Sequence, residues 1–233
     1  MAILSLDLVA AAPWGEELLQ DINLELDAGQ VLAILGPNGA GKTSLLNLLC
    51  GAVTPTRGDY RFGGRPMADW PISQRACSQA VLPQHSSLNF PYTVEEVILL
   101  GRTPHASGAT CDRLILDEVL AATDTLYLRD RLYTQLSGGE KQRVQLGRAF
   151  AQVWRAADSD LRLLMLDEPT AALDLSHQVL ILDQLRSMAR QGCAVVMVVH
   201  DFNLAARYAD LCLVLHNGHQ RALGAPSEIF TPA

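Results

Sequence analysis

The 233-residue chain has no apolar run of the roughly 18 to 20 residues that a membrane-spanning helix needs. Its longest hydrophobic stretches, Val31–Leu35, Leu161–Leu166 and Ala194–Val199, have the length of strands. The first ten residues contain Asp7 and no basic leader, so we do not expect a signal peptide. These absences argue against a chain that crosses a bilayer by itself.

Cysteine and positive charge are also scarce. The cysteines are scattered, odd in number and form no C-x-x-C pair, which argues against metal or disulfide roles and predicts reduced thiols in a cytosolic protein. Lysine and arginine number 18 against 25 acidic residues, which gives a net charge of -7. Because binding to nucleic-acid phosphates depends on clustered Lys and Arg, this balance argues against a nucleic-acid partner. The five scattered cysteines are Cys50, Cys77, Cys111, Cys193 and Cys212.

What is present is an ordinary globular composition, 49% apolar and 18% charged, in a chain of single-domain length. The patterning predicts two or three strands over residues 3–35, a helical middle from 91 to 153, and then strands alternating with helices. Strands separated by helices favour an α/β fold with a mostly parallel sheet covered on both faces. The helical middle would then be an inserted lobe.

Several element boundaries can be assigned in advance. Thr93 and Glu96 have the spacing of a helix capping box, and the dipeptide Asn217-Gly218 is favoured by type I′ hairpin turns. The later strands are expected at Leu163–Leu166, Ala194–Val199 and Leu211–Leu215. Helices are expected after Gly41 and over Thr93–Gly101, Asp112–Thr123, Gly138–Val153, Ser176–Gln191 and Asp201–Ala209.

A glycine-rich segment follows the strand expected at Val31–Leu35 and opens a helix. It matches G-x-x-x-x-G-K-[ST], in which glycines let successive backbone N–H groups converge on an anion at a helix N-terminus. Lys42 is expected to reach the β- and γ-phosphates of a nucleotide, and the Thr43 hydroxyl to ligate Mg²⁺. The alternative is a glycine turn with a solvated lysine. The predicted phosphate-binding residues are Gly36, Pro37, Asn38, Gly39, Ala40, Gly41, Lys42, Thr43 and Ser44.

Two acids, Asp167 and Glu168, directly follow four consecutive apolar residues. The carboxyl ends of parallel strands are where open α/β sheets bind ligands. Asp167 is therefore predicted to hold Mg²⁺, directly or through water, and Glu168 to point toward the γ-phosphate and polarise the attacking water. The alternative is that both carboxylates simply cap the turn before Pro169.

The segment Leu136–Glu140, followed by Lys141–Arg143, resembles the signature motif of the ATP-binding subunits of ABC transporters. A serine hydroxyl, glycine N–H groups and a helix N-terminus make it a second anion cradle. The resemblance implies a P-loop NTPase, RecA-like fold with a mostly parallel sheet, an N-terminal antiparallel β subdomain and an inserted α-helical subdomain. A plain capped helix start is the alternative for this segment.

The resemblance also implies a domain plan and a dimer. Residues 1–233 would form a single ATPase domain, with 1–84 and 154–233 as the core and 85–153 as the helical signature subdomain. In that family the signature of one copy closes on the Mg-ATP held by the other. The residues expected to face the partner's nucleotide are Ser137, Gly138, Gly139 and Glu140.

Other positions fall in the family's order along the chain. Gln84 resembles the Q-loop glutamine, which senses Mg²⁺ and the attacking water and hinges the helical lobe. His200 resembles the switch histidine, which bonds the γ-phosphate and positions Glu168, and Asp174 resembles the D-loop residue that contacts the opposite subunit. Trp14, the only aromatic residue before the phosphate loop, is the candidate adenine platform, with a spacing shorter than the family pattern. Packing, surface or helix-cap roles are the alternatives.

Partners follow from the same resemblance. Besides a second copy of itself, the chain is expected to act with integral-membrane permease subunits, as a peripheral protein at the cytoplasmic face of a bacterial inner membrane. A substrate-binding protein would take part indirectly. The exposed segment Gln84–Tyr92 is the expected docking surface for the permease, and a surface loop without a partner is the alternative.

The cargo rests on resemblance alone. Leu99–His105 looks like the importers of iron chelates, haem and cobalamin, whereas Ala151–Trp154 and Leu173–Gln178 look most like the ATPase of bacterial haem importers. Haem is therefore the expected cargo, and ferric siderophore or cobalamin the alternatives. A soluble ABC ATPase acting on DNA or ribosomes is the alternative of another class. Surface or helix-cap roles suffice for His85, His105 and His177, which are not expected to ligate haem.

Overall fold

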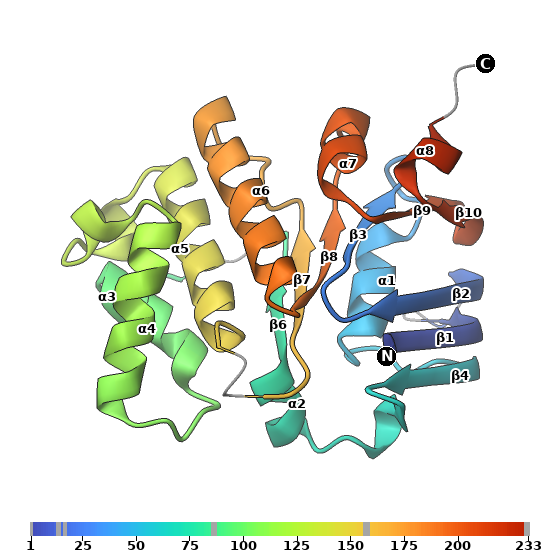
Figure 1. The fold of residues 1–233 in the computed structure, drawn as a ribbon, viewed down its shortest axis with the longest axis horizontal. Coiled ribbons are helices and arrows are strands. Elements are labelled where there is room, and N and C mark those ends of the chain that lie inside the picture. The colour runs from blue at the N-terminus through green and yellow to red at the C-terminus, as the bar shows by residue number, and fades with distance from the viewer. Residues whose placement is uncertain (1, 13–14, 16–17, 85–87, 156–158, 231–233) are drawn as a thin grey trace.

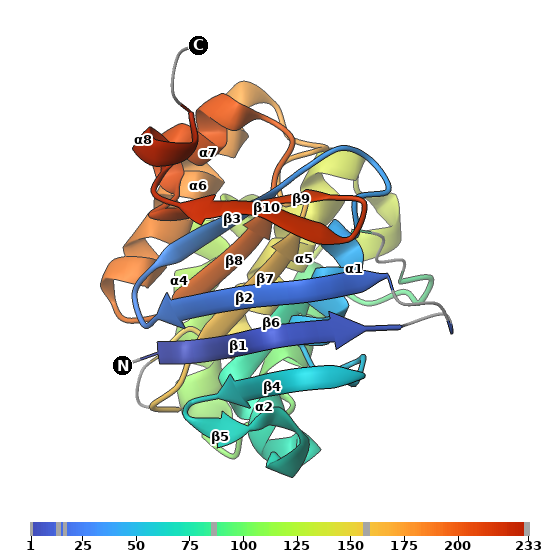
Figure 2. The same cartoon turned by 90° about the vertical axis from the view of Figure 1, so that its right-hand side faces the viewer.

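The computed structural model describes the chain except for residues 1, 13–14, 16–17, 85–87, 156–158 and 231–233. The described residues form one sheet of ten strands in the order β5-β4-β1-β2-β10-β9-β3-β8-β7-β6 (Figures 1 and 2). The α/β class predicted from the sequence is confirmed. The strands are β1 (Ala2–Ala11), β2 (Leu19–Asp27), β3 (Val31–Leu35), β4 (Arg57–Phe62), β5 (Arg65–Pro66), β6 (Gln79–Leu82), β7 (Leu163–Asp167), β8 (Ala194–Val198), β9 (Leu211–His216) and β10 (His219–Gly224).

The sheet has a parallel part and an antiparallel part. The neighbours from β9 through β3, β8 and β7 to β6 all pair in parallel, and every residue of β3, β7 and β8 is buried. β1 pairs antiparallel with β2 and β4, and Figure 2 shows these strands crossing in front of β7 and β8. β10 joins the two parts, because it is antiparallel to β9 and parallel to β2. The antiparallel β subdomain is thereby confirmed.

Helices cover both faces of the parallel part. Side chains alternate along a strand, so neighbouring residues enter different cores. Leu164 and Val195 pack in one core with α5 (Gly138–Gln152), α6 (Leu175–Arg190) and α7 (Phe202–Tyr208). Met165 and Val196 pack in the other core with α1 (Lys42–Leu49) and the inner faces of β1 and β2. The strand ends are consequently held between two packed layers.

The middle of the chain is helical and lies at the left of Figure 1. Within the described part of the segment, Thr93 closes the predicted capping box with Glu96 and starts the first helix. The second long helix begins at Ala109, earlier than expected, after Gly108 with φ +84°. The elements are α3 (Val94–Leu99), η2 (Leu100–Arg102), α4 (Ala109–Ala122), η3 (Leu126–Leu128), η4 (Tyr133–Gln135) and α5.

Residues 57–82 hold elements that the sequence analysis leaves unassigned. They are β4, β5, η1 (Met67–Asp69), α2 (Ile72–Ser78) and β6, and a further short helix, α8 (Pro226–Ile229), follows β10. β4 buries only Tyr60 and Phe62 among charged and polar neighbours, so its apolar signal is weak. α2 is seven residues long and starts directly after Pro71, too short to display a helical period.

Three smaller expectations can be checked. Asn217 and Gly218 both have positive φ, +49° and +76°, as the predicted type I′ turn between β9 and β10 requires. All five cysteines lie in the described part of the chain and are free thiols. Of the helices that the structure describes, none combines the length and the apolar character needed to traverse a membrane.

Candidate nucleotide-binding site

The phosphate loop connects β3 to α1. Gly41, with φ +99°, occupies the N-cap of α1 in a conformation that L side chains rarely adopt. Gly36 lies directly against the backbone of β9. A Cβ added at Gly36 would come within 2.2 Å of the Leu215 carbonyl oxygen. The tight turn therefore depends on glycine at both ends. It directs the backbone toward a helix N-terminus, the arrangement that favours an anion.

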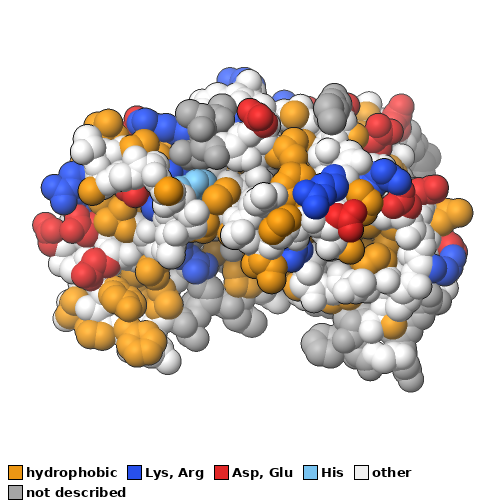
Figure 3. Space-filling model, turned by 90° about the horizontal axis from the view of Figure 1, so that it is seen from below, with side chains coloured by type: hydrophobic (Ala, Val, Ile, Leu, Met, Phe, Trp, Pro, Cys, Tyr) orange, Lys and Arg blue, Asp and Glu red, His pale blue; other side chains and the backbone are white. Residues whose placement is uncertain are grey.

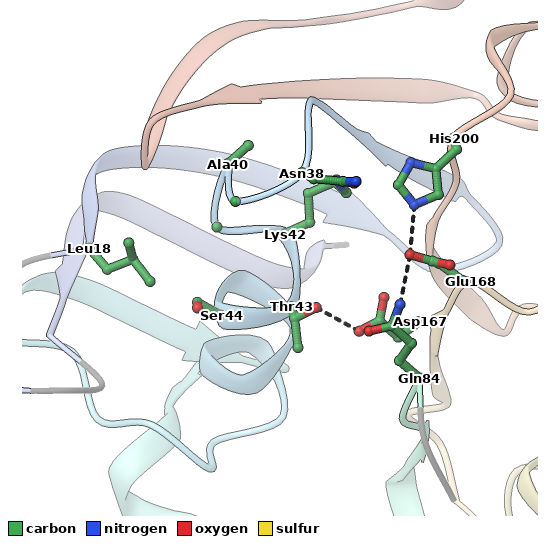
Figure 4. Close-up of a pocket in the computed structure, with 12 residues that line it drawn as sticks. Leu18, Asn38, Ala40, Lys42, Thr43, Ser44, Gln84, Asp167, Glu168 and His200 are labelled. Atoms are coloured by element: carbon green, nitrogen blue, oxygen red, sulfur yellow. Dashed lines mark hydrogen bonds and ion pairs between the residues drawn. The ribbon is translucent and has the colours of Figure 1, made fainter.

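Lys42 lies against the loop that precedes it (Figure 4). Its side chain is 7% exposed, and Nζ donates hydrogen bonds to the carbonyl oxygens of Gly36 and Pro37 at 2.8 and 2.9 Å. An ammonium group held by two neutral carbonyls can exchange them for charged phosphate oxygens, which accept stronger hydrogen bonds. These two hydrogen bonds therefore hold Lys42 at the position where a triphosphate would enter.

Thr43 and Asp167 face each other across the gap between α1 and β7. The Thr43 hydroxyl donates to Asp167 Oδ2 at 2.8 Å. Burial raises the pKa of the Asp167 carboxyl, and the Thr43 hydrogen bond offsets part of that rise. A hydroxyl and a carboxylate supply the hard oxygen ligands that Mg²⁺ takes together with water and phosphate oxygens. The residues present therefore fit a magnesium ion.

The Glu168 carboxylate contacts two other predicted site residues, Gln84 and His200. Its Oε1 accepts hydrogen bonds from Gln84 Nε2 at 3.0 Å and from His200 Nε2 at 2.6 Å (Figure 4). Glu168 has φ +52°, a left-handed conformation that is uncommon for a residue other than glycine. This backbone turns the carboxylate away from the line of β7. Side chains that follow β6 and β8 converge on one oxygen atom of the residue that follows β7.

A single cavity of about 650 Å³ unites these groups. Its size is that of a ligand site, and phosphate-loop residues form one wall of it. Gln84, Asp167, Glu168 and His200 form the opposite wall. The sequence analysis did not identify Leu18, which also lines the cavity and carries no signal beyond an apolar residue before β2. Trp14, the predicted adenine platform, lies outside the described residues, as does His85.

The signature segment is placed elsewhere on the chain. Ser137 is the N-cap of α5: its hydroxyl accepts from Glu140 N at 3.4 Å, and the Glu140 carboxylate accepts from Ser137 N at 2.8 Å. Hydrogen bonds to the Glu140 carboxylate, first from the Ser137 backbone N–H and then from the Ser137 side chain, hold the pKa of Glu140 below its usual value. Ser137 and Gly138 are exposed, and within the described structure no residue of the segment lines the cavity. The segment predicted as a second anion cradle therefore does not contribute to this cavity.

The segment after Glu168 packs against the signature helix. Gln142 Nε2 donates to the Pro169 carbonyl at 3.2 Å, and an added Cβ at Gly139 would lie 3.1 Å from the Ala172 carbonyl oxygen. The same segment ends at Asp174, which is exposed and caps α6 by accepting from His177 N at 2.9 Å. Asp174, like the signature, is absent from the described cavity lining.

The β9–β10 turn supports the phosphate loop, a role that its Asn-Gly sequence does not reveal. Gly218 N donates to the Ala40 carbonyl at 3.0 Å, while the Gly218 carbonyl accepts from Gln20 N at 3.0 Å. The turn thus connects the loop to β2. Its shape could be predicted from two residues, whereas its contact required the sheet order.

A glycine loop between a buried strand and a helix, with an acidic strand end beside it on a mostly parallel sheet, defines a P-loop nucleoside triphosphatase. A family model described as ABC transporter matches residues 19–171. The chain belongs to this family, and its domain is an ATP-binding one.

Individual relatives agree with that assignment. The chain is 51% identical over 220 residues to the hemin import ATP-binding protein HmuV of Gloeobacter violaceus, covering 94% of this chain and 80% of the relative. It is 52% identical to the protein of the same name from Pseudomonas entomophila, over 93% of this chain and 84% of the relative.

Solved structures give the same fold. An ATP-binding subunit of an ABC transporter superposes with a TM-score of 0.86 at 25% identity, covering 97% of this chain and 91% of that one. The structure of cbiO1 from Clostridium perfringens, part of the ABC transporter complex cbiONQ, gives a TM-score of 0.83 at 27% identity, covering 98% and 90%. The predicted family and fold are therefore confirmed.

Proposed function

We propose that this chain hydrolyses ATP to power the import of haem through separate membrane subunits. The observation that carries hydrolysis is the convergence of Gln84 and His200 on one oxygen of Glu168, in the cavity that also holds the Thr43–Asp167 pair. The haem cargo is supported by relatives named hemin import ATP-binding proteins, which match 94% and 93% of the chain. Ferric siderophore and cobalamin are the alternative cargoes.

The phosphate loop would bind the triphosphate before any chemistry. Loop N–H groups from Asn38 to Ser44 and the N-terminus of α1 favour the anion, and Lys42 adds a charged donor. Mg²⁺, held by Thr43 and Asp167 with Gln84 nearby, would neutralise charge on the β- and γ-phosphates.

Glu168 is the proposed acceptor of the water proton. A carboxylate that already receives two hydrogen bonds keeps a fixed orientation, and both of these bonds, from Gln84 and His200, go to Oε1 rather than Oε2. His200 Nε2 lies 2.6 Å from the carboxylate and on the cavity wall, where it can also reach a terminal phosphate. General-base assistance of this kind contributes about 10²- to 10⁴-fold to a rate.

The signature segment would complete the site of a second copy. Ser137, Gly138, Gly139 and Glu140 form a helix N-terminus that is exposed at its first two residues and does not line the chain's own cavity. Asp174 is likewise exposed and would contact the opposite copy. Two chains arranged head to tail would then enclose two ATP molecules. The helical part, residues 85–153, would move as a unit against residues 1–84 and 154–233.

The helical end is the proposed docking side for permease subunits. Seen from below, hydrophobic side chains gather over the left-hand end, which α3 and α4 form in Figure 1 (Figure 3). Exposed large hydrophobic side chains of this part include Phe90, Tyr92, Leu100 and Leu114. Exposed apolar patches mark interaction sites. The chain would then be peripheral to the cytoplasmic face of a bacterial inner membrane, with a substrate-binding protein acting on the far side.

Replacing Glu168 by Gln tests the hydrolytic assignment. The change keeps the side-chain shape but removes the proton acceptor, so ATP affinity should stay within about threefold while kcat falls about 10²-fold or more. Steady-state ATPase rates and equilibrium binding of ATP measure the two quantities. Glu25→Gln, at an exposed position of β2, is the matched control. Hydrolysis by Glu168→Gln at the wild-type rate would remove Glu168 from this role.

The cargo is tested with the permease present. The chain is reconstituted with its membrane partner in vesicles, and ATPase stimulation is measured with haem, ferric siderophore and cobalamin carriers in turn. Stimulation by the haem carrier alone is expected. Stimulation by another carrier without haem would reject the cargo and leave the ATPase proposal standing.

A further inference from the structure

His177 lies in the first turn of α6 and faces two carboxylates. Its Nδ1 is 2.8 Å from Asp174 Oδ2, and its Nε2 is 3.2 Å from Asp124 Oδ2. The imidazole is only 25% exposed. Both ring nitrogens therefore face carboxylate oxygens, which are acceptors for a ring N–H. One side chain therefore spans two acids that are far apart in sequence.

The two aspartates belong to different parts of the molecule. Asp174 ends the segment 171–174, which follows Glu168 and Pro169, and it caps α6. Asp124 lies in the turn between α4 and η3, in the helical part. The contact from His177 to Asp124 crosses 53 positions of the chain. It therefore ties the segment beside the proposed hydrolytic carboxylate to the helical lobe.

Asp124 is itself held by the signature helix. Arg143 on α5 donates to Asp124 Oδ2 at 3.0 Å and to the Asp124 carbonyl, and it donates to Tyr127 OH at 2.8 Å. The Arg143 side chain is 4% exposed, so its position is fixed by packing. Asp124 has φ +50°, a left-handed conformation that directs its carboxylate between α5 and α6. The chain of contacts runs from Asp174 through His177 and Asp124 to Arg143.

A helix cap alone does not account for this arrangement. Capping α6 requires only that Asp174 accept from the His177 backbone N–H, which it does at 2.9 Å. Neither the ring contact with Asp124 nor the Arg143 contact contributes to that cap. Hydrogen bonds from the His177 N–H, the Ser176 hydroxyl and the His177 ring hold the pKa of Asp174 well below its usual value, so a charged acceptor is available to the ring.

We propose, on the basis of the ATP hydrolysis proposed above, that His177 is a positioning residue that ties the segment 171–174 to the signature helix through Asp124 and Arg143. When Ser137 and Gly138 engage a nucleotide, α5 moves as a rigid rod, and the tie makes the segment after Glu168 follow it. Removing the tie leaves the phosphate loop and Lys42 untouched. Hydrolysis should therefore suffer while nucleotide binding does not.

Three substitutions at His177 separate the two ring contacts. His177→Ala removes both, His177→Gln keeps an amide nitrogen at the reach of Nε2 toward Asp124, and His177→Asn keeps one at the reach of Nδ1 toward Asp174. For steady-state ATPase of the full chain, Ala and Asn should lower kcat about three- to thirtyfold with KM for ATP unchanged. The Gln variant should stay close to wild type. Arg190→Ala, at the exposed far end of the same helix, is the control.

A double-mutant cycle with Asp124→Ala closes the test. If the two side chains act through one tie, the double variant is no slower than the slower single variant. The proposal would be overturned if the kcat losses of the two single variants multiplied in the double variant. It would also be overturned by wild-type kcat in His177→Ala, or by activity that His177→Asn retains and His177→Gln loses. An inactive wild-type chain would instead refute the proposed ATPase function, and with it the role of the tie. Thermal unfolding midpoints verify that every variant is folded.

Discussion

Lys42 is one of two lysines in the chain, and its buried ammonium depends on the loop carbonyls until a phosphate replaces them. Lys42→Ala should weaken ATP binding about ten- to a hundredfold, because each charged hydrogen bond contributes about 1.5–3 kcal/mol. Titration with a fluorescent ATP analogue measures this loss. Lys141→Ala, at the other lysine, should bind ATP normally, and unchanged affinity in the Lys42 variant would count against the cradle.

The residue-level site could be predicted in part. The phosphate loop and the two acids could be identified because spacing along the chain forces their neighbours in space. The shared oxygen of Glu168 could not, since it depends on the left-handed φ of that residue and on side chains that follow β6 and β8. The roles assigned to Gln84, His200 and Asp174 stay predictions, as does that of Trp14.

Among the elements, a partly buried ion pair connects η2 to the first turn of α4. Arg102 is 3% exposed and donates to Asp112 Oδ1 at 2.9 Å and to Ser107 Oγ at 2.9 Å. Burial raises the pKa of the Asp112 carboxyl. The hydrogen bonds from Ser107 and Arg102 together lower it by more than burial raises it, so the pKa lies below its usual value. The pair therefore stabilises the folded chain most when the carboxylate is ionised.

Asp112→Asn should lower the free energy of unfolding by about 1–2 kcal/mol at neutral pH, a range reduced for the partial exposure of the carboxylate. Since the folded pKa is below the unfolded one, this contribution is present above about pH 3.9 and disappears as the pH falls through the folded value. Urea unfolding from about pH 7 to pH 3 should show the two proteins converging. Asp117→Asn, an exposed pair on the same helix, should change little. A constant difference at all pH values would contradict the assignment.

The elements differed in how well they could be predicted. β3, β7 and β8 follow continuous apolar runs and α3 begins with the predicted capping box, so pattern alone indicated them. β4 and α2 could not be found this way, because β4 buries two side chains and α2 is shorter than two helical turns. Their positions depend on tertiary pairing with β1 and β6, which no local pattern records.

For the whole molecule, the central prediction is that two copies enclose the nucleotide. Glu168→Gln should be monomeric without ATP and dimeric with it, as measured by analytical ultracentrifugation. Adding Gly138→Asp to the Glu168→Gln protein should abolish the dimer, because the introduced carboxylate would face the negatively charged phosphates of the partner's ATP. An added Cβ at Gly138 meets no atom within 4 Å, so the chain should tolerate the change.

Gly138→Ala is the matched control for that experiment, since it adds the Cβ without the charge. It should retain the ATP-dependent dimer. ATP binding by the single copy should be equal in all three proteins, because residue 138 does not line the described cavity. A dimer that persists with Asp at position 138 would mean that the signature does not face the partner's nucleotide.

The turn at Asn217-Gly218 has a consequence for attempts to shorten or rearrange this polypeptide. Gly36 and Ala40 rest on backbone from β9 and the following turn, which lie beyond the residues 19–171 that match the family. A truncation ending before β9 would retain every motif from the glycine loop to His200. It would still lack the backbone of β9 and the following turn, against which the glycine loop packs. Minimal fragments, split reporters and circular permutants built from this chain must therefore include the β9–β10 pair if they are to bind nucleotide.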